Sequence, residues 1–220
     1  MAYKILMVDD HPIQIEGYKT ILQYNNKNIE IETTSCFNCQ EAYNIITNTT
    51  NPVRFDLVFL DRSLPPYLEK KIKSGEDLAV LARKHWPETK IVILTSHAEA
   101  FILFDIVHKV RPNGLLIKSD FDGEILLEAF DAIIEGNTYY TETVKESIKE
   151  RLLSQGHLDS VDRQIITLIS EGFQIKTIAE TMNLSQDTIK KRKSKIKDLL
   201  GIDKGNDEDI LKECRHLRLI

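Results

Sequence analysis

The chain has 220 residues, a length that suits one large domain or two small ones, each with its own core. With 42% hydrophobic and 29% charged residues it has an ordinary globular composition, and its net charge of −5 excludes DNA binding through overall positive charge. No apolar run is long enough to cross a bilayer, and Asp9 and Asp10 come too early for a secretory signal, so we expect a cytoplasmic protein.

Short β-branched runs alternate with helical patterns over the first 136 residues. The apolar runs predict five strands, at Tyr3–Val8, Asn28–Thr34, Phe55–Leu60, Lys90–Thr95 and Gly114–Ile117. Helical spacing predicts a helix after each strand, at Pro12–Tyr24, Asn38–Thr47, Gly75–His85, Ala98–Lys109 and Phe121–Gly136. Strands that alternate with helices in this way indicate an α/β fold with a parallel sheet covered on both faces.

The pattern changes after Gly136, beyond which the sequence predicts no further strand. Residues 137–156 are polar and predict a linker that is helical from about Thr141 and ends at Gly156. From Leu158 onward the spacing of apolar residues predicts four short helices. We therefore expect a first domain over residues 1–136, a linker over 137–156 and a second, all-α domain over 157–220.

The three cysteines, Cys36, Cys39 and Cys214, argue against a disulfide framework, which normally uses an even set in a smaller chain. Cys36 and Cys39 form a C-x-x-C, which is typical of redox sites at the start of a helix. However, Asn38 followed by Glu41 is typical of a helix N-cap with a capping box, which favours two incidental thiols at a helix start. The histidines have no metal-ligand spacing among themselves or with the cysteines.

Polar residues stand where the strands of the predicted sheet end. Asp9 and Asp10 follow the first strand, Asp61 follows the third, Thr95 ends the fourth and Lys118 follows the fifth. The carboxyl ends of parallel strands meet at one edge of a sheet, where ligands bind in open α/β folds. We therefore expect these five side chains to converge at that edge.

The residue types at this edge predict phosphoryl transfer. Neighbouring carboxylates repel one another, and a divalent cation relieves that repulsion. Oxygen ligands without His or Cys favour Mg²⁺. Asp61 would then be the nucleophile, with Mg²⁺ and Lys118 neutralising the phosphoryl oxygens and Thr95 holding one of them.

The segments ILMVDDHP, VFLDRSLP, VILTS and GLLIKSD resemble the receiver domain of two-component response regulators over about residues 3–136. The resemblance implies a flavodoxin-like, CheY-like fold and phosphorylation of Asp61 by a partner histidine kinase. It also implies a Mg²⁺ site, with direct ligands from Asp10, Asp61 and the Ser63 backbone carbonyl, and with Asp9 acting through water. Thr95 and Lys118 would contact the phosphoryl group.

Three features depart from the receiver pattern. Receivers usually carry an aromatic switch residue three positions before the lysine, whereas this chain has Leu115 there. The segment from Pro65 to Gly75 is a longer loop than usual, which is either a tolerated surface insertion or an element for kinase docking or pocket covering. The predicted fourth helix has a very apolar stretch from Phe101 to Phe104, which suggests that more of it is covered than usual.

The second domain carries a strongly basic helix. A short turn before Ser185, a good N-cap, separates this helix from the one before it, as in a helix-turn-helix. Residues 188–197 read TIKKRKSKIK, with six cationic residues and no acidic one. Since exposed helix faces usually mix charges of both signs, this run favours attraction to the phosphates of DNA.

The stretch ISEGFQIKTIAETMNLSQDTIKKRKSKIKDLLGI resembles the LuxR-like (NarL/FixJ) effector domain. By that resemblance Lys190, Lys191 and Ser194 face bases, and Lys176, Lys193 and Lys195 are candidate phosphate contacts. Arg192, which stands where the family commonly has His, is a further DNA-binding candidate. Residues 206–220 resemble the helix through which two such domains pair on DNA, and its expected apolar contacts are Ile210, Leu211 and Leu217.

These features together predict a DNA-binding response regulator that works as a homodimer on double-stranded DNA. Phosphorylation of Asp61 would alter dimerisation and the control of transcription, and the chain would catalyse no reaction besides its own phosphorylation and dephosphorylation. An aspartate-based phosphatase is disfavoured, because such enzymes need an acid where this chain has Ser63. Leu115 leaves open a third hypothesis, a phosphorylation-independent transcription regulator whose receiver serves for dimerisation.

Overall fold

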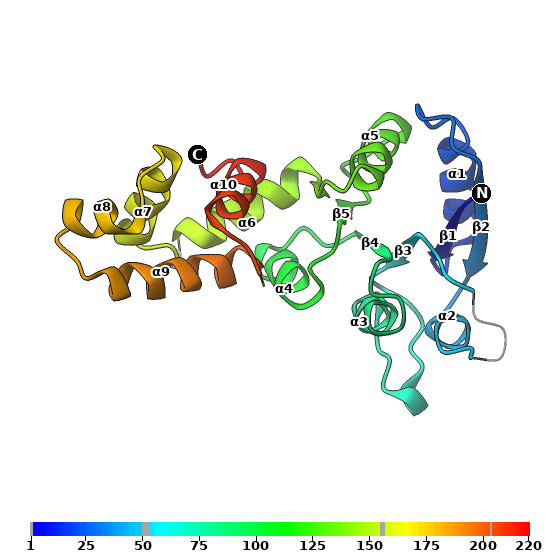
Figure 1. Ribbon diagram of the computed structural model, residues 1–220. Coiled ribbons are helices and arrows are strands. Elements are labelled where there is room, and N and C mark those ends of the chain that lie inside the picture. Colours follow the sequence, from blue (N-terminus) through cyan, green and yellow to red (C-terminus); the bar gives the residue numbers. More distant parts are fainter. Residues whose placement is uncertain (1, 50–52, 155–156, 203) are drawn as a thin grey trace. The chain divides into compact units, whose positions relative to one another are not determined.

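The computed structural model describes residues 2–49, 53–154, 157–202 and 204–220 (Figure 1). Contacts divide the chain into two compact units. The first comprises Met1–Ala98 with Lys109–Val144, and the second comprises Glu99–His108 with Lys145–Ile220. The domain boundaries expected at residues 136 and 156 stay predictions.

The first unit contains a parallel sheet in which the described residues form six strands, in the order β2-β1-β3-β4-β5-β6. The bounds are β1 Tyr3–Val8, β2 Ile31–Cys36, β3 Leu57–Asp61, β4 Lys90–Thr95, β5 Gly114–Ile117 and β6 Tyr139–Tyr140. The five predicted strands and their parallel pairing are confirmed, with ends that differ by a few residues. The order changes direction at β1 and β3, which is the switch point where ligands bind in such sheets.

The sixth strand corrects the expectation that no strand follows Gly136. β6 pairs in parallel with β5, so that Tyr139 lies opposite Gly114 and Tyr140 opposite Leu115. A strand of two residues is too short to show the alternation on which prediction depends. Thr141 extends the attachment, because its N–H donates to the carbonyl of Leu115 at 3.2 Å.

Five helices follow the first five strands, as predicted: α1 Pro12–Leu22, α2 Cys39–Ile46, α3 Gly75–His85, α4 Ala100–Val110 and α5 Gly123–Ile134. Helices α1 and α5 cover one face of the sheet, where Ile15 and Phe130 pack with Ile5, Phe59 and other sheet residues in a buried cluster. Helices α2 and α3 pack against each other, and α3 contacts β3 and β4. The result is the expected flavodoxin-like arrangement.

The long segment between β3 and α3 is folded rather than extended. It contains a short 3-10 helix, η1 Leu68–Lys70, and an antiparallel bridge between Tyr67 and Ile72. The ring of Tyr67 meets the ring of Tyr43 on α2 edge-on, with centroids 5.5 Å apart. Ile72 is buried, whereas Leu68 is exposed. The segment therefore lies against α2, and its role stays open.

The second unit contains the predicted run of helices: α7 Ser160–Ser170, α8 Ile175–Thr181, α9 Gln186–Leu199 and α10 Asp207–His216. They follow α6 Glu142–Ser154, the helix expected in the linker. The predicted cap is confirmed at Ser185, whose hydroxyl accepts from the N–H of Thr188 at 3.1 Å. Helix α9 packs on α7 and α8, and α10 packs on α7.

The apolar part of α4 is largely covered, as its composition predicts. Leu103 and Ile106 are fully buried, while Phe101 keeps 55% of its surface exposed. Phe104 stacks on His157 with ring centroids 5.5 Å apart, and the guanidinium of Arg151 lies 5.2 Å from the same ring. Residues that follow the sheet in sequence therefore contact α4. For this reason residues Glu99–His108 belong to the second unit.

The cysteines are buried as free thiols, and burial raises the pKa of Cys36 and of Cys214 to about 12. Asn38 caps α2 by accepting from the N–H of Glu41 at 2.9 Å, which agrees with the interpretation of the C-x-x-C as a helix start. Among the described residues, no helix combines the length and apolar character needed to span a membrane.

Candidate functional site

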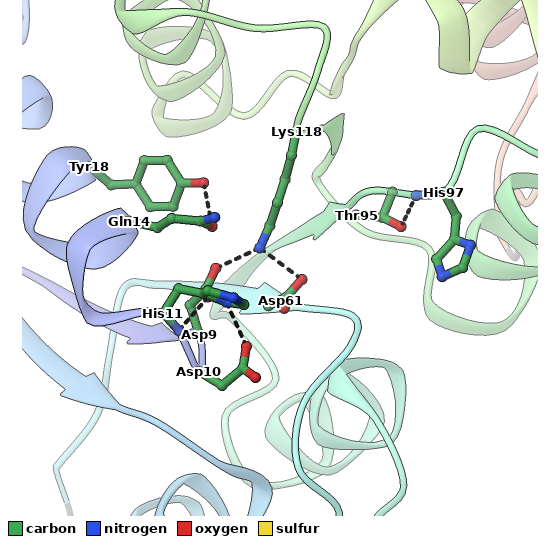
Figure 2. Close-up of polar contacts among 9 residues, drawn as sticks. All are labelled: Asp9, Asp10, His11, Gln14, Tyr18, Asp61, Thr95, His97 and Lys118. Carbon is green, nitrogen blue, oxygen red and sulfur yellow. Dashed lines mark hydrogen bonds and ion pairs between the residues drawn. The ribbon is translucent and has the colours of Figure 1, made fainter.

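Asp9, Asp61 and Lys118 meet at the edge of the sheet where β1, β3 and β5 end (Figure 2). The ammonium of Lys118 lies 2.8 Å from Oδ2 of Asp9 and 3.2 Å from Oδ1 of Asp61. Both carboxylates are nearly buried, with side chains 3% and 5% exposed. The convergence expected from the strand ends is therefore present for these three residues.

The charges at this edge do not balance, since one ammonium faces two buried carboxylates. Burial raises the pKa of Asp61 above its ordinary value, the charge of Lys118 lowers it, and the charge of Asp9 raises it again. The N–H of Ser63 also donates to the Asp61 carboxylate, which favours the ionised form. An added cation at this point would therefore stabilise the pair.

Asp10 lies beside this pair and is partly exposed. The Nδ1 atom of His11 is 2.9 Å from Oδ1 of Asp10 and 3.2 Å from Oδ1 of Asp9. The N–H of His11 also donates to Oδ1 of Asp9 at 2.9 Å. The ligand atoms of Asp9, Asp10 and His11 all lie within 4.8 Å of one another, as in a metal-binding group. His11 was not among the predicted site residues, although it follows the two aspartates directly.

Thr95 is fully buried at the end of β4, and its side chain points away from the Asp61 carboxylate (Figure 2). Its hydroxyl oxygen accepts from the N–H of His97 at 3.0 Å, and its carbonyl accepts from the N–H of Lys118 at 2.7 Å. Thr95 is thus tied to Lys118 through the backbone. Its hydroxyl hydrogen is not used by either contact.

Tyr18 and Gln14, on α1, lie on the same side of the sheet edge as Lys118 (Figure 2). The hydroxyl of Tyr18 donates to Oε1 of Gln14 at 3.4 Å. Burial, together with the charges of Asp9 and Asp61, raises the pKa of Tyr18 well above its ordinary value. Tyr18 is therefore a neutral donor near this edge. Its position in the helical pattern of α1 predicts a core residue, so sequence reasoning missed it.

Gly75, the first residue of α3, packs closely against the backbone of Asp61. Its N–H donates to the carbonyl of Arg62 at 3.1 Å. A Cβ atom at Gly75 would lie 2.1 Å from the carbonyl oxygen of Asp61, far inside contact distance. Glycine is therefore required at this position, because only a residue without a side chain lets α3 pack this closely against the backbone of Asp61.

The basic helix α9 presents four of its predicted contact residues on its exposed surface. Lys190, Lys191, Ser194 and Lys195 are exposed, and Lys176 is exposed on α8. Lys190 lies 3.6 Å from the exposed carboxylate of Asp187, which stands three residues before it on the helix. Such a surface pair contributes little and leaves the ammonium available to a ligand.

Three predicted contacts on α9 form ion pairs with acidic residues of the same domain. Arg192 and Lys195 each lie 2.7 Å from a different oxygen of Asp162, which is fully buried on α7. Lys193 forms an ion pair with Asp207 at the start of α10. The run of six lysines and arginines alone could not reveal these partners, because Asp162 and Asp207 are distant in sequence. Their roles in binding DNA stay predictions.

Two of the three expected dimer contacts are buried within the single chain, and all three stay predictions. Ile210 and Leu217 on and next to α10 are 0% and 2% exposed within a single chain, because α10 packs on α7. The amphipathic pattern identified them as apolar contacts and could not distinguish an internal partner from an external one. Leu211 is partly exposed and stays a candidate.

Comparison with known proteins agrees with this geometry. Residues 5–131, more than half of the chain, match the family described as response regulator receiver domain. The oxygen regulatory protein NreC of Staphylococcus aureus is 28% identical over 214 residues, which cover 90% of this chain and 91% of NreC.

Solved structures of the RcsB response regulator have the same fold. A structure of Salmonella typhimurium RcsB, described as showing conformational dynamism for DNA interaction, is 23% identical with a TM-score of 0.57, covering 100% of this chain and 99% of that one. A second, of RcsB from Salmonella enterica serovar Typhimurium bound to promoter rprA with the phosphomimetic BeF3−, is 22% identical with a TM-score of 0.55, covering 98% and 99%. With the acidic pocket of Asp9, Asp61 and Lys118 in place, the chain belongs to the response regulator receiver domain family.

Proposed function

We propose that this chain is a DNA-binding response regulator whose receiver is phosphorylated on Asp61 by a histidine kinase. The observation that carries the proposal is the contact of Lys118 with both Asp9 and Asp61 at the strand ends. A buried carboxylate beside a fixed ammonium is suited to accept a phosphoryl group, because the ammonium offsets the negative charge that the group brings.

The donor atoms fit Mg²⁺. The site offers carboxylate oxygens from Asp9, Asp10 and Asp61, and Lys118 leaves the two buried carboxylates with excess negative charge. Hard oxygen donors of this kind suit Mg²⁺ better than softer metals. Asp10, Asp61 and the carbonyl of Ser63 would hold the ion directly, with Asp9 acting through water. When bound, Mg²⁺ supplies positive charge to the phosphoryl oxygens.

The reaction is a transfer from phosphohistidine to a carboxylate. A carboxylate oxygen of Asp61 attacks the phosphorus, the P–N bond to the kinase histidine breaks, and that histidine nitrogen keeps the electron pair. Lys118 neutralises one phosphoryl oxygen. The hydroxyl hydrogen of Thr95 can donate to another after rotation of the side chain, since the contact with His97 uses only the oxygen. The chain's remaining reaction would be hydrolysis of its own aspartyl phosphate.

The second part of the proposal is recognition of double-stranded DNA by α9, with Lys190, Lys191 and Ser194 at base edges and Lys176 at a phosphate. The exposed positions of these four residues support it. RcsB, which shares the fold, is described as bound to promoter DNA with a phosphomimetic. By this analogy we propose that the chain acts on DNA as a homodimer, with Ile210, Leu211 and Leu217 of the α10 region as candidate contacts and Leu211 the most exposed of the three.

Phosphorylation is tested by incubating the full chain with Mg²⁺ and a small phosphodonor such as acetyl phosphate, followed by intact mass measurement. We expect one phosphoryl group on the wild-type chain and none on Asp61→Asn. The exposed Asp105 of α4 provides a matched control, and Asp105→Asn should be labelled like the wild type. Undiminished labelling of Asp61→Asn would remove the acceptor assignment.

One observation favours a second function. Leu115, at the position of the aromatic switch, is fully buried in β5, and no ring can rotate there when Thr95 moves. The chain could then regulate transcription without phosphorylation and use its receiver to dimerise. The two functions differ in whether a phosphoryl mimic changes the affinity of the chain for DNA.

A further inference from the structure

Asp162 on α7 is a completely buried carboxylate that faces the basic helix α9. Its relative exposure is 0%, and both of its oxygens have partners. Oδ1 accepts from Nη1 of Arg192 at 2.7 Å, and Oδ2 accepts from Nζ of Lys195 at 2.7 Å and from the N–H of Asp159 at 3.3 Å. A buried charge is stable only when its hydrogen bonds are made, so this group needs α9 in one position.

The two cations that meet Asp162 lie on one flank of α9. Arg192 and Lys195 are three residues apart, and residues at this spacing share a helix face. Arg192 also contacts Asp159, at 2.8 and 3.0 Å from its two carboxylate oxygens. The hydrogen bond from Arg192 lowers the pKa of Asp159 to about 2, so this carboxylate is ionised at neutral pH. Asp162 of α7 and its N-cap Asp159 therefore hold this flank.

The other flank of α9 is held by the start of α10. Lys193 pairs with Asp207, and Nζ of Lys197 lies 3.4 Å from the carbonyl oxygen of Gly205. Ile189 and Ile196 are fully buried between the flanks. At 100° per residue, Lys191 and Ser194 then lie on the side opposite these isoleucines, with Lys190 and Lys195 about 110° from them on either side. The helix is thus held on both flanks and along its core face, and Lys195 keeps 44% of its side chain exposed beside the strip formed by Lys191 and Ser194.

We propose that Asp162 is a positioning residue for DNA recognition, an inference that rests on the function proposed above. It withdraws Arg192 and Lys195 from phosphate contact and fixes the rotation of α9, so that Lys190, Lys191 and Ser194 meet the base edges. Of the six cationic residues of α9, those on the flanks set the orientation of the helix. Fewer phosphate contacts weaken the binding to DNA of any sequence, whereas the fixed orientation of α9 improves discrimination between sequences.

The proposal predicts an unusual response to a neutralising substitution. In Asp162→Asn the buried charge is gone, so that Lys195 becomes free to reach a phosphate and Arg192 keeps only its contact with the exposed carboxylate of Asp159. Each released counterion adds about 0.9 to the slope of log affinity against log salt concentration. We therefore expect tighter binding to a shuffled duplex, a slope that is steeper by about 1, and a preference for the specific duplex that is lower by roughly tenfold.

The experiment uses the full chain, a duplex selected from a random pool by the wild-type chain, and a shuffled duplex of equal composition. Affinities for both are measured between 50 and 300 mM salt, roughly the range in which phosphate contacts are screened. Asp187→Asn is the matched control, since this exposed carboxylate lies beside Lys190 on the same helix. Because no buried network changes there, Asp187→Asn should keep most of the preference for the selected duplex.

A second variant keeps the test decisive if Asp162→Asn does not fold. In the triple variant with Asp162→Asn, Arg192→Gln and Lys195→Gln, residue 162 and its two former partners on α9 are neutral and no cation is released. We expect a slope close to that of the wild type but a reduced preference, because the rotation of α9 is no longer fixed by charge. Unchanged preference in the triple variant, or a folded Asp162→Asn with unchanged slope and preference, would overturn the proposal.

Failure of the proposed function itself gives a different result. If α9 does not bind DNA, the wild-type chain binds neither duplex, and Lys190→Ala with Lys191→Ala changes nothing. If α9 binds DNA but Asp162 does not position it, the wild-type chain prefers the selected duplex and this double variant weakens binding, while the Asp162 variants leave the preference intact.

Discussion

At the scale of single residues, the position of Asp61 depends on its close contact with Gly75, a residue without a side chain. Gly75 lies so close to the carbonyl of Asp61 that a methyl group would overlap it, at 2.1 Å. Gly17, in the middle of α1, has no atom within 4 Å of the place where its Cβ would be. The two glycines therefore make a matched pair for testing whether close packing positions the acceptor.

Gly75→Ala should lower the free energy of unfolding by about 1 to 3 kcal/mol, because backbone atoms must move to admit the methyl group. It should also slow the phosphorylation of Asp61 by acetyl phosphate. Gly17→Ala should instead raise stability by about 0.5 to 1 kcal/mol, since alanine favours the helix. Urea unfolding and labelling rates measure both effects, and a harmless Gly75→Ala would contradict the packing argument.

Glu213 on α10 makes stability depend on pH. Burial raises the pKa of this carboxyl from 4.5 to about 7, with the nearby charge of Lys212 acting in the opposite direction. The folded state then holds a proton that the unfolded state releases, so the contribution is fully present below about pH 4.5 and is lost as pH rises toward 7. Stability should therefore fall over this interval.

The side chain in Glu213→Gln cannot ionise, so this variant should not lose stability at Glu213 as pH rises. Its free energy of unfolding, relative to the wild type, should rise by about 1 to 3 kcal/mol between pH 4.5 and pH 7.5. Urea unfolding followed by circular dichroism at several pH values gives the difference. The exposed Glu146 of α6 supplies the control, and an equal rise in Glu146→Gln would show that burial of Glu213 is not the cause.

At the scale of elements, the sequence predicts strands and helices that have a repeating pattern, and it misses elements of only a few residues. The apolar runs of β1 and β4 and the cap of α2 by Asn38 have clear periodic or chemical signals, and each is present. The two residues of β6 give no such signal, and the bridge between Tyr67 and Ile72 depends on packing against Tyr43 of α2. Contacts of this kind arise from tertiary structure, which no local pattern encodes.

The end of β6 makes a further contact beside the pocket. Thr141 is buried, and its hydroxyl oxygen accepts at 3.3 Å from the N–H of Ile117, the residue before Lys118. Thr141→Val leaves this buried donor without its partner and should cost about 1 to 3 kcal/mol in urea unfolding. Thr177→Val, at an exposed position of α8, is the comparison and should change stability by less than about 0.5 kcal/mol. Equal effects would show that the hydrogen bond is unimportant.

The same kind of limit applies to the candidate site. The strand ends correctly predict that Asp9, Asp61 and Lys118 meet, because parallel strands bring their carboxyl ends to one edge. The contact of His11 with both neighbouring aspartates, and the burial of Ile210 against its own domain, depend on side-chain packing that the sequence does not reveal.

At the scale of the whole molecule, the charges are unevenly distributed. The chain has a net charge of −5, yet α9 alone carries six cationic residues between Lys190 and Lys197. A buried acidic pocket in the first unit and a basic helix in the second are the two parts that a phosphorylation-controlled DNA-binding protein needs. The proposal requires that these parts communicate, and this is the central claim.

The most direct test of that claim measures the affinity of the full chain for its selected duplex at fixed salt, with and without Mg²⁺ and beryllofluoride as a phosphoryl mimic. A coupling of about 1 to 3 kcal/mol, typical of allosteric proteins, predicts a change in affinity of roughly 5- to 150-fold. Asp61→Asn should show no change. Equal affinities of the wild-type chain under both conditions, with beryllofluoride bound, would contradict the account and favour the phosphorylation-independent regulator.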